Sequence, residues 1–329
     1  MKVLALAAGV ILLSSNLLAQ DGPQAQPAPA PTFRSASALV ALNVTVQDRG
    51  AKFVRGLQPA DFVVYEDGVK QDVRFFESTR VPVDLIVLID TSTSMRDKLA
   101  TVHEAASEFL RTLRPDDRGA VVSFANSVSV LQPLTADQAL LEKAVRSTQP
   151  SGSTCLNNAV YIALKQFGQS AHQGEDVRRQ AIVVLSDGAD TASVVSFDDV
   201  IGLARRMGVS IYTVSLQSMV ESRQSQTWGR RGMEDADFTM KALAKETGAQ
   251  SFFPTTSGLK EVYASIASEL ASQYSIGYVP ANGQADGTFR RVNVQVVTRP
   301  DVRSRTRLGY TAEAGRRSAL PGLGGGDQR

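Results

Sequence analysis

The sequence predicts an α/β protein with a doubly wound, mostly parallel sheet, flanked by a small β domain built from N- and C-terminal segments. Three observations predict this class. Short apolar runs recur through the middle of the chain, amphipathic stretches separate them, and apolar residues alternate at a period of two before and after that region. Strand–helix alternation with continuous apolar strands is typical of a parallel sheet that helices cover on both faces.

The N-terminal residues 1–19 are predicted to be a secretory signal peptide. Lys2 supplies a positive start, an apolar stretch follows from Val3 to Leu13, and cleavage is expected after the small residue Ala19. A membrane anchor is the alternative, but the stretch is short for spanning a bilayer. Residues 20–34 are rich in Pro, Ala and Gln and are expected to form a semi-rigid linker. No later segment has the apolar length of a membrane span, so we expect a secreted or periplasmic mature chain with no transmembrane segment.

Residues 35–80 are predicted to form an N-terminal β segment. Apolar residues alternate with smaller or polar ones from Val40 to Val46, which is the period of a strand. The apolar runs Phe62–Tyr65 and Val73–Phe76 enclose Asp67-Gly68. Because Asp-Gly is a favoured two-residue turn, we expect these two runs to pair as a hairpin.

Residues 81–272 are predicted to form the α/β domain. Its apolar runs lie at 84–89, 120–124, 181–185, 210–216 and 250–253. Apolar helical faces begin at Leu99, Leu156 and Leu259. We expect Thr135 and Gln138 to form a capping box and Ser196 to be an N-cap. Residues 218–235 have no clear period and are expected to form a mobile surface loop.

Residues 273–311 are predicted to form a C-terminal β segment, and the Gly-rich residues 312–329 a disordered tail. Strands are expected from Tyr274 to Val279 and around Val292–Val296. Arg303, Arg305 and Arg307 alternate with other residues and are expected to form a solvated strand face. Each terminal β segment is too small to be stable alone, so we expect the two to pair, with the α/β domain inserted between them.

Composition limits the function classes. The 329 residues include 35 basic and 33 acidic side chains, for a net charge of +2, which argues against nucleic-acid binding. Cys155 is the only cysteine, so an intrachain disulfide is impossible, and we expect it to be a small packed residue rather than an acidic thiol. The two histidines do not have zinc-ligand spacing.

A polar cluster follows the apolar run 84–89. Asp90, Ser92 and Ser94 are expected at the carboxyl end of a buried parallel strand, where open α/β sheets bind ligands. Thr154 precedes a predicted helix and Asp187 ends another apolar run, so both are expected at the same edge. Carboxylate and hydroxyl oxygens suit a hard divalent cation. The alternatives are a helix-capping role for Asp90 with its two serines, an N-cap role for Thr154 and a turn-forming role for Asp187.

These residues resemble a known family. Asp90-x-Ser92-x-Ser94, Thr154 in a Gly-Ser-Thr context and Asp187-Gly188 are similar to the von Willebrand factor type A (vWA) domain, over residues 81–272. The flanking segments, such as Glu66-Asp67-Gly68 and Gly309-Tyr310, resemble those of bacterial exported vWA-related proteins. Two positions depart from the family pattern, because Thr93 and Ser153 stand where glycine is usual.

The resemblance implies a metal-ion-dependent adhesion site (MIDAS). Ser92, Ser94 and Thr154 would give hydroxyl oxygens to Mg²⁺, or to Mn²⁺ or Ca²⁺, and Asp90 and Asp187 would act directly or through water. One coordination position would remain for an Asp or Glu carboxylate of a protein partner. The expected function is therefore non-enzymatic adhesion or protein binding.

Two other functions remain open from the sequence. One is a structural envelope module in which the ion only stabilises the fold. The other is a Mg²⁺-dependent phosphatase of the haloacid-dehalogenase type, in which a strand-end aspartate such as Asp90 is the nucleophile. That family requires a second acid two residues later, and Ser92 stands there instead.

Overall fold

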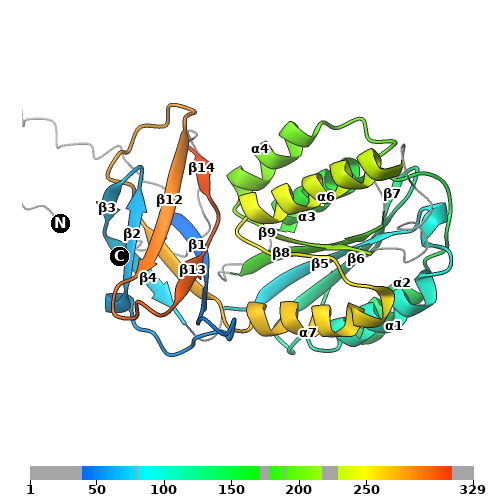
Figure 1. The fold of residues 1–329 in the computed structure, drawn as a ribbon, viewed down its shortest axis with the longest axis horizontal. Coiled ribbons are helices and arrows are strands. Elements are labelled where there is room, and N and C mark those ends of the chain that lie inside the picture. The colour runs from blue at the N-terminus through cyan, green and yellow to red at the C-terminus, as the bar shows by residue number, and fades with distance from the viewer. Residues whose placement is uncertain (1–38, 79–80, 171–177, 188–189, 217–228, 313–329) are drawn as a thin grey trace, which may run out of the picture. The chain divides into compact units, whose positions relative to one another are not determined.

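The computed structural model describes residues 39–78, 81–170, 178–187, 190–216 and 229–312 (Figure 1). The predicted signal peptide and linker and the predicted tail from residue 313 onward lie outside the described residues. Within the described part of the chain, no helix has both the length and the apolar character needed to cross a membrane.

A six-stranded sheet forms the centre of the α/β region, in the order β10-β9-β8-β5-β6-β7. Its strands are β5 (Val83–Asp90), β6 (Arg118–Phe124), β7 (Val128–Thr135), β8 (Arg179–Ser186), β9 (Ser210–Ser215) and β10 (Ser251–Phe252). Neighbouring strands are parallel except β6 and β7. The predicted mostly parallel sheet is confirmed, and each of the five apolar runs forms one of its strands.

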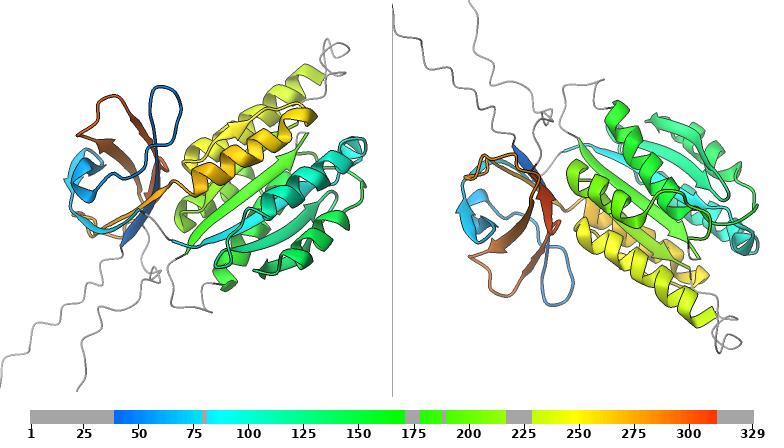
Figure 2. Two further views of the ribbon diagram at one scale, coloured as in Figure 1. Left: turned by 90° about the horizontal axis from the view of Figure 1, so that it is seen from below. Right: turned by 90° about the horizontal axis from the view of Figure 1, so that it is seen from above.

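Helices cover both faces of this sheet (Figures 1 and 2). Helices α1 (Leu99–Leu110), α2 (Gln138–Arg146) and α7 (Leu259–Leu270) lie on one face, and α3 (Leu156–Ser170), α4 (Phe197–Met207) and α6 (Gly229–Glu246) lie on the other. Alternate residues of β5 enter opposite cores: Leu85 and Val87 pack with α1 and α7, whereas Ile86 and Leu88 pack with α3 and α4. This accounts for the continuous apolar run, since all eight residues of β5 are buried.

Two elements of the α/β region differ from the sequence prediction. Strand β7 was not predicted, because it is an edge strand with mostly exposed or half-buried residues and contains Pro133. The predicted loop at 218–235 is wrong for its last residues, because helix α6 begins at Gly229. Glycines and charged residues dominate the sequence of the first turns of α6, so no apolar helical period is visible there.

One predicted helix start is confirmed and one is wrong. Ser196 is the N-cap of α4, and its hydroxyl accepts a hydrogen bond from the Asp199 backbone N–H at 3.1 Å. The N-cap of α2 is Asp137 rather than Thr135, and its carboxylate accepts from the backbone of Ala139 and Leu140. A carboxylate directly before the first helical residue reaches these two N–H groups, whereas a hydroxyl two residues earlier does not.

The segments that flank the α/β region, residues 39–78 and 273–312, form two antiparallel sheets of four strands each. Their orders are β13-β1-β11-β4 and β14-β12-β2-β3. The N-terminal strands are β1 (Val40–Gln47), β2 (Phe62–Glu66), β3 (Val69–Gln71) and β4 (Val73–Glu77). The C-terminal strands are β11 (Tyr274–Tyr278), β12 (Phe289–Val296), β13 (Arg303–Arg305) and β14 (Gly309–Thr311). The inner faces of both sheets share one core, so the predicted fold class, with a β domain built from both termini, is confirmed.

The predicted hairpin has a different second strand. Asp67 and Gly68 do form the turn, with φ of 48° and 83°, but β2 pairs with Val69–Gln71. The run Val73–Phe76 lies in β4, which pairs with β11 in the other sheet. Because the turn has only two residues, the second strand begins directly at Val69. This strand is short and largely polar, so an apolar pattern in the sequence does not indicate it.

Two of the three alternating arginines do not form a solvated face. Arg305 donates to Glu269 of α7 at 2.7 Å and to the Gly248 carbonyl, and Arg307 donates to the Arg205 carbonyl. Glu269 is 1% exposed and also accepts from the hydroxyls of Thr45 and Tyr212. Arg305 and Arg307 therefore join the C-terminal β segment to the α/β region, which burial patterns in the sequence do not reveal.

Candidate metal centre

Asp90 is the last residue of β5 and has no exposed surface. One of its carboxylate oxygens accepts from the Ser92 backbone N–H at 2.7 Å, and the other accepts from the Ser186 hydroxyl at 2.5 Å. The register explains the second contact, because Ile89 of β5 lies opposite Leu185 of β8 and the next residues along both strands are therefore neighbours. Ser186 was not predicted as part of the site, although a parallel pairing of the two apolar runs would have indicated it.

The two motif serines lie beside each other in the turn after β5. Ser92 precedes a 3₁₀ turn, η2 (Thr93–Met95), that contains Ser94. Their hydroxyl oxygens are 3.0 Å apart, and the Ser94 hydroxyl donates to Asp187 at 2.7 Å. Asp187 follows the end of β8, and its side chain is 2% exposed. A continuous chain of hydrogen bonds therefore connects Asp90, Ser92, Ser94 and Asp187, which are four of the five predicted site residues.

Thr154 reaches this edge of the sheet through its loop. The Ser151 N–H donates to the Thr91 carbonyl at 2.6 Å, and the backbone and hydroxyl of Thr93 both donate to the Gly152 carbonyl. These bonds join the two loops, and Thr154 is 5% exposed. Among the hydrogen bonds of the described residues, none links the Thr154 hydroxyl to the other four predicted residues. The structure thus brings the loops together without a direct contact from that hydroxyl.

The two departures from the usual glycines fit the local backbone. Positive φ in the second loop falls on Gly152, at 67°, and not on Ser153. A Cβ at Gly152 would lie 2.4 Å from the side chain of Asn126, which in turn accepts from the Ser153 N–H at 2.7 Å. Thr93 uses its side chain to hold the Gly152 carbonyl. Neither substitution therefore requires a strained residue at the site.

Asp190 has a structural role that was not predicted. Its carboxylate accepts from the Asn157 N–H in the first turn of α3 at 2.7 Å, and from the Ser193 N–H at 2.9 Å. It therefore satisfies a free N–H group at the start of α3, in place of the N-cap role considered for Thr154. Cys155 beside that helix start is buried, and burial raises the pKa of its thiol.

Lys98 forms a direct ion pair with this network and was also not predicted. It immediately precedes α1, and its Nζ donates to the outer oxygen of Asp187 at 2.5 Å. The Lys98 side chain is 15% exposed. Nothing in its sequence spacing marks it, because the contact depends on how a long side chain folds back over the site.

Charge at the site is unevenly compensated. Asp187 has Lys98 as a direct partner, whereas the hydrogen-bond partners of Asp90 are the backbone of Ser92 and the hydroxyl of Ser186. Burial raises the pKa of Asp90 to about 6, although both of these hydrogen bonds oppose the shift. A buried carboxylate with only neutral donors gains strongly from a nearby cation.

The donor set fits a hard divalent cation. Two adjacent ligands of octahedral Mg²⁺, each ~2.1 Å from the ion, lie roughly 3 Å apart. The hydroxyl oxygens of Ser92 and Ser94 have this separation, at 3.0 Å. Across the described ranges, no three His, Cys, Asp or Glu residues form a metal-binding group, so hydroxyls would have to complete the ligand set.

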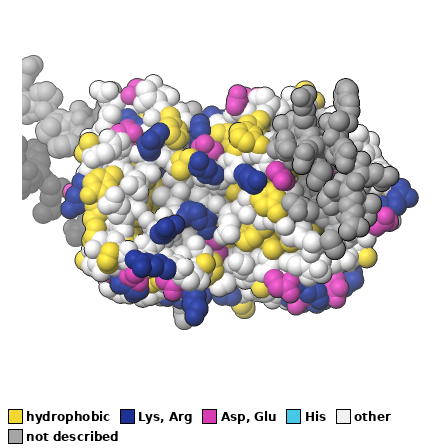
Figure 3. Space-filling view, viewed as in Figure 1, with side chains coloured by type: hydrophobic (Ala, Val, Ile, Leu, Met, Phe, Trp, Pro, Cys, Tyr) yellow, Lys and Arg dark blue, Asp and Glu magenta, His cyan; other side chains and the backbone are white. Residues whose placement is uncertain are grey.

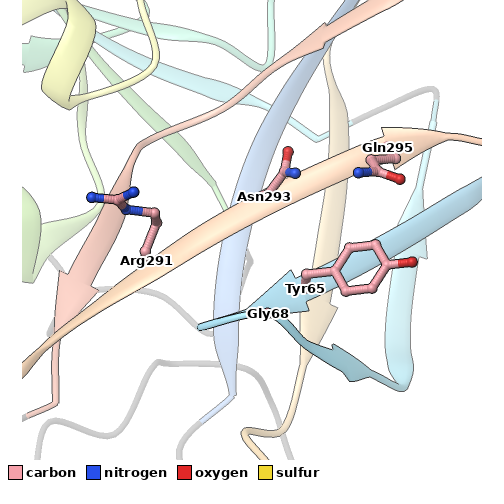
Figure 4. Close-up of a pocket in the computed structure, with 5 residues that line it drawn as sticks. All are labelled: Tyr65, Gly68, Arg291, Asn293 and Gln295. Atoms are coloured by element: carbon pink, nitrogen blue, oxygen red, sulfur yellow. The ribbon is translucent and has the colours of Figure 1, made fainter.

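Other surface features lie away from this edge. A groove of about 320 Å³ on the outer face of β2 and β12 is lined by Tyr65, Gly68, Arg291, Asn293 and Gln295 (Figure 4). None of the predicted site residues lines it. On the face seen in Figure 3, basic and acidic side chains are interspersed, so neither sign covers it completely.

The sequence matches a known family at the residues that build this edge. Residues 85–189 match the model of the von Willebrand factor type A domain. The matched stretch includes Asp90, Ser92, Ser94, Thr154 and Asp187. Residues 85–189 of this chain therefore form a von Willebrand factor type A domain.

Bacterial relatives extend the similarity beyond the matched stretch. A UPF0353 protein of Mycobacterium leprae (strain Br4923) is 28% identical over 255 residues, which cover 72% of each chain. Among solved structures, a von Willebrand factor type A protein from Catenulispora acidiphila is 15% identical, with a TM-score of 0.48, over 85% of this chain and 65% of that one. Proximal thread matrix protein 1 from the mussel byssus, described with a zinc-occupied MIDAS motif, is 14% identical, with a TM-score of 0.46, over 62% and 49%.

Proposed function

We propose that this protein is an exported, non-enzymatic binding module whose vWA domain holds Mg²⁺, or Mn²⁺ or Ca²⁺, and uses it to capture acidic side chains of a protein partner. The observation that carries the proposal is the hydrogen-bonded chain from Asp90 through Ser92 and Ser94 to Asp187, with the serine hydroxyls 3.0 Å apart. The export part of the proposal rests on the predicted signal peptide at residues 1–19.

In this proposal, each residue has a distinct role. Ser92, Ser94 and Thr154 would give hydroxyl oxygens to the ion, and Asp90 and Asp187 would orient the hydroxyls and bound waters or bind directly. Neutral hydroxyl ligands reduce the charge of the ion very little. The ion would therefore remain able to attract a carboxylate from a partner, at the edge of the sheet where ligands of α/β proteins usually bind.

The hydrogen bonding of Asp90 favours a binding role over a phosphatase role. Both of its carboxylate oxygens already accept hydrogen bonds, from Ser92 and Ser186, and the side chain is completely buried. A nucleophilic aspartate needs an oxygen that a phosphate group can approach. The residue two positions later is Ser92, which cannot act as the second acid of that reaction.

Isothermal titration with MgCl₂ and MnCl₂ tests the ion site. We expect the full-length protein to bind one divalent ion and the double variant Ser92→Ala/Ser94→Ala to lose at least about tenfold in affinity. Ser153→Ala is the matched control, because Ser153 lies in the same edge loops but contacts Asn126 through its backbone. Equal affinity in the wild-type protein and the double variant would refute the assigned ligands.

A second measurement separates partner capture from a purely structural ion. We expect a Glu-rich peptide to bind in Mg²⁺ and to dissociate in EDTA, whereas a peptide with Gln at the same positions does not bind. The structural alternative predicts a higher melting temperature in Mg²⁺ with no difference between the two peptides. That result would replace the adhesion function with a stabilising role for the ion.

A further inference from the structure

We infer that Lys98 is a built-in countercharge that lowers the affinity of the site for its divalent ion and keeps the loaded site positive for an acidic ligand. The inference rests on the proposed function, because it concerns the same ion. It assigns the regulation of the site to a residue outside the ligand motif.

The contact of Lys98 is specific. Its Nζ is 2.5 Å from one oxygen of Asp187, while the other oxygen accepts from Ser94 at 2.7 Å. Lys98 and Ser94 thus each donate to a different oxygen of the Asp187 carboxylate. Lys98 does not contact the hydroxyls of Ser92 and Ser94 among the hydrogen bonds of the described residues, so it acts on the ion through Asp187 and through its charge.

The pair is also protected from water. The Asp187 side chain is 2% exposed and that of Lys98 is 15% exposed. Solvent therefore weakens the field of the ammonium group much less than it would at the surface. The other charged residues of the same turn, Arg96 and Asp97, are both exposed, which leaves Lys98 as the shielded cation of this turn.

The charges decide what the loaded site can bind. Asp90 and Asp187 supply two negative charges when ionised, and Lys98 cancels one of them. A divalent ion would therefore leave a net charge of about +1, whereas without Lys98 the loaded site would be neutral. The lysine repels the incoming ion and weakens Asp187 as an oxygen donor, and the same positive charge then attracts the carboxylate of a ligand.

Replacing Lys98 tests the inference through two effects of opposite sign. We expect Lys98→Met to bind Mg²⁺ about tenfold more tightly in isothermal titration, since the repelling charge is removed and the apolar stem is kept. In saturating Mg²⁺ we expect the same variant to bind the Glu-rich peptide several-fold more weakly, because the loaded site has lost the positive charge that attracts the peptide carboxylates. Lys98→Arg is the matched control and should resemble the wild-type protein in both measurements.

A merely structural role for Lys98 would weaken both kinds of binding, because the site would lose its shape. Unchanged or weaker Mg²⁺ affinity in Lys98→Met overturns the inference while leaving the proposed function intact. Absence of Mg²⁺ binding in the wild-type protein and in Lys98→Met overturns both. Lys98→Gln, compared by circular dichroism and titrated in the same way, decides the question if the methionine variant fails to fold.

Discussion

The two ends of strand β5 each contain a buried aspartate, but only one of the two has a countercharge from the chain. Asp84, at the amino end, is 2% exposed and forms ion pairs with Arg118 at 2.6 Å and Arg178 at 2.7 Å. Asp90, at the carboxyl end, is fully buried, and its hydrogen-bond partners are a backbone N–H and a serine hydroxyl. The contrast separates a carboxylate whose countercharge belongs to the chain from one that is suited to a cation from outside.

The largest effect on stability is expected at the amino end of β5, where Asp84 is paired with two arginines. Asp84→Asn leaves two largely buried guanidinium groups without a countercharge, so we expect the free energy of unfolding to fall by about 3 kcal/mol. Urea denaturation in EDTA measures this loss. Mg²⁺ affinity should stay at the wild-type value, since Asp84 lies at the opposite end of the strand. A loss below about 1 kcal/mol would mean that the ion pairs of Asp84 with Arg118 and Arg178 contribute little to the stability of the folded protein.

At the carboxyl end of β5, the stability of the protein is expected to depend on pH through Asp90. Burial raises the pKa of Asp90 to about 6 from 3.8, so the folded protein keeps a proton that the unfolded chain has released. In EDTA this group therefore favours folding at low pH, and the benefit is lost as the pH rises through 6. Between about pH 4.5 and pH 8, the free energy of unfolding of the wild-type protein should therefore fall by about 2 kcal/mol relative to that of Asp90→Asn.

Urea denaturation of both proteins at several pH values gives this difference. The amide variant is the control, because it keeps the shape of the side chain and cannot titrate. A difference that stays constant with pH would show that the Asp90 charge is compensated inside the folded chain, as that of Asp84 is.

The smallest expected effect concerns the hydroxyl donor to Asp90. Ser186→Ala removes a 2.5 Å hydrogen bond to the ionised carboxylate of Asp90. We therefore expect the free energy of unfolding to fall by about 1.5 kcal/mol at pH 8 in EDTA. Ser107→Ala is a suitable control, because the Ser107 hydroxyl is buried in α1 and has no hydrogen-bond partner among the described residues. Equal unfolding midpoints for the two variants would argue that the Ser186 contact contributes nothing to the folded state.

Much of the site follows from strand ends that can be recognised in the sequence. Asp90 directly follows one apolar run and Asp187 lies two residues after another, and neighbouring parallel strands bring such ends together. Lys98 and Asp190 could not be predicted in the same way, because their contacts depend on the paths of a flexible side chain and of a loop from another part of the chain. Domain boundaries at residues 81 and 272 and the ligand roles themselves remain predictions.

The elements of the fold also differ in how clearly the sequence predicts them. Buried strands such as β5 and β8 are apolar along their whole length and are visible in the sequence. Edge strand β7 lacks that pattern, because an edge strand of mostly exposed or half-buried residues does not bury a continuous apolar face. The first turns of α6 lack it in sequence, because they are rich in glycine and charged residues. The pairing of Arg305 with Glu269 was hidden for another reason, since alternation shows which residues share a face but not what covers it.

Strands from the N-terminal and C-terminal segments pair in the same sheets, which sets the order in which these sheets can form during synthesis. Glu66 binds the hydroxyl of Tyr310, 244 positions further along the chain, and β1 lies between two C-terminal strands. At a synthesis rate of about 5–20 residues per second, the first strands wait roughly 10–50 s for their partners. During that interval β1 has neither of its partner strands, β11 and β13, so both of its edges stay unpaired until the C-terminal strands are made.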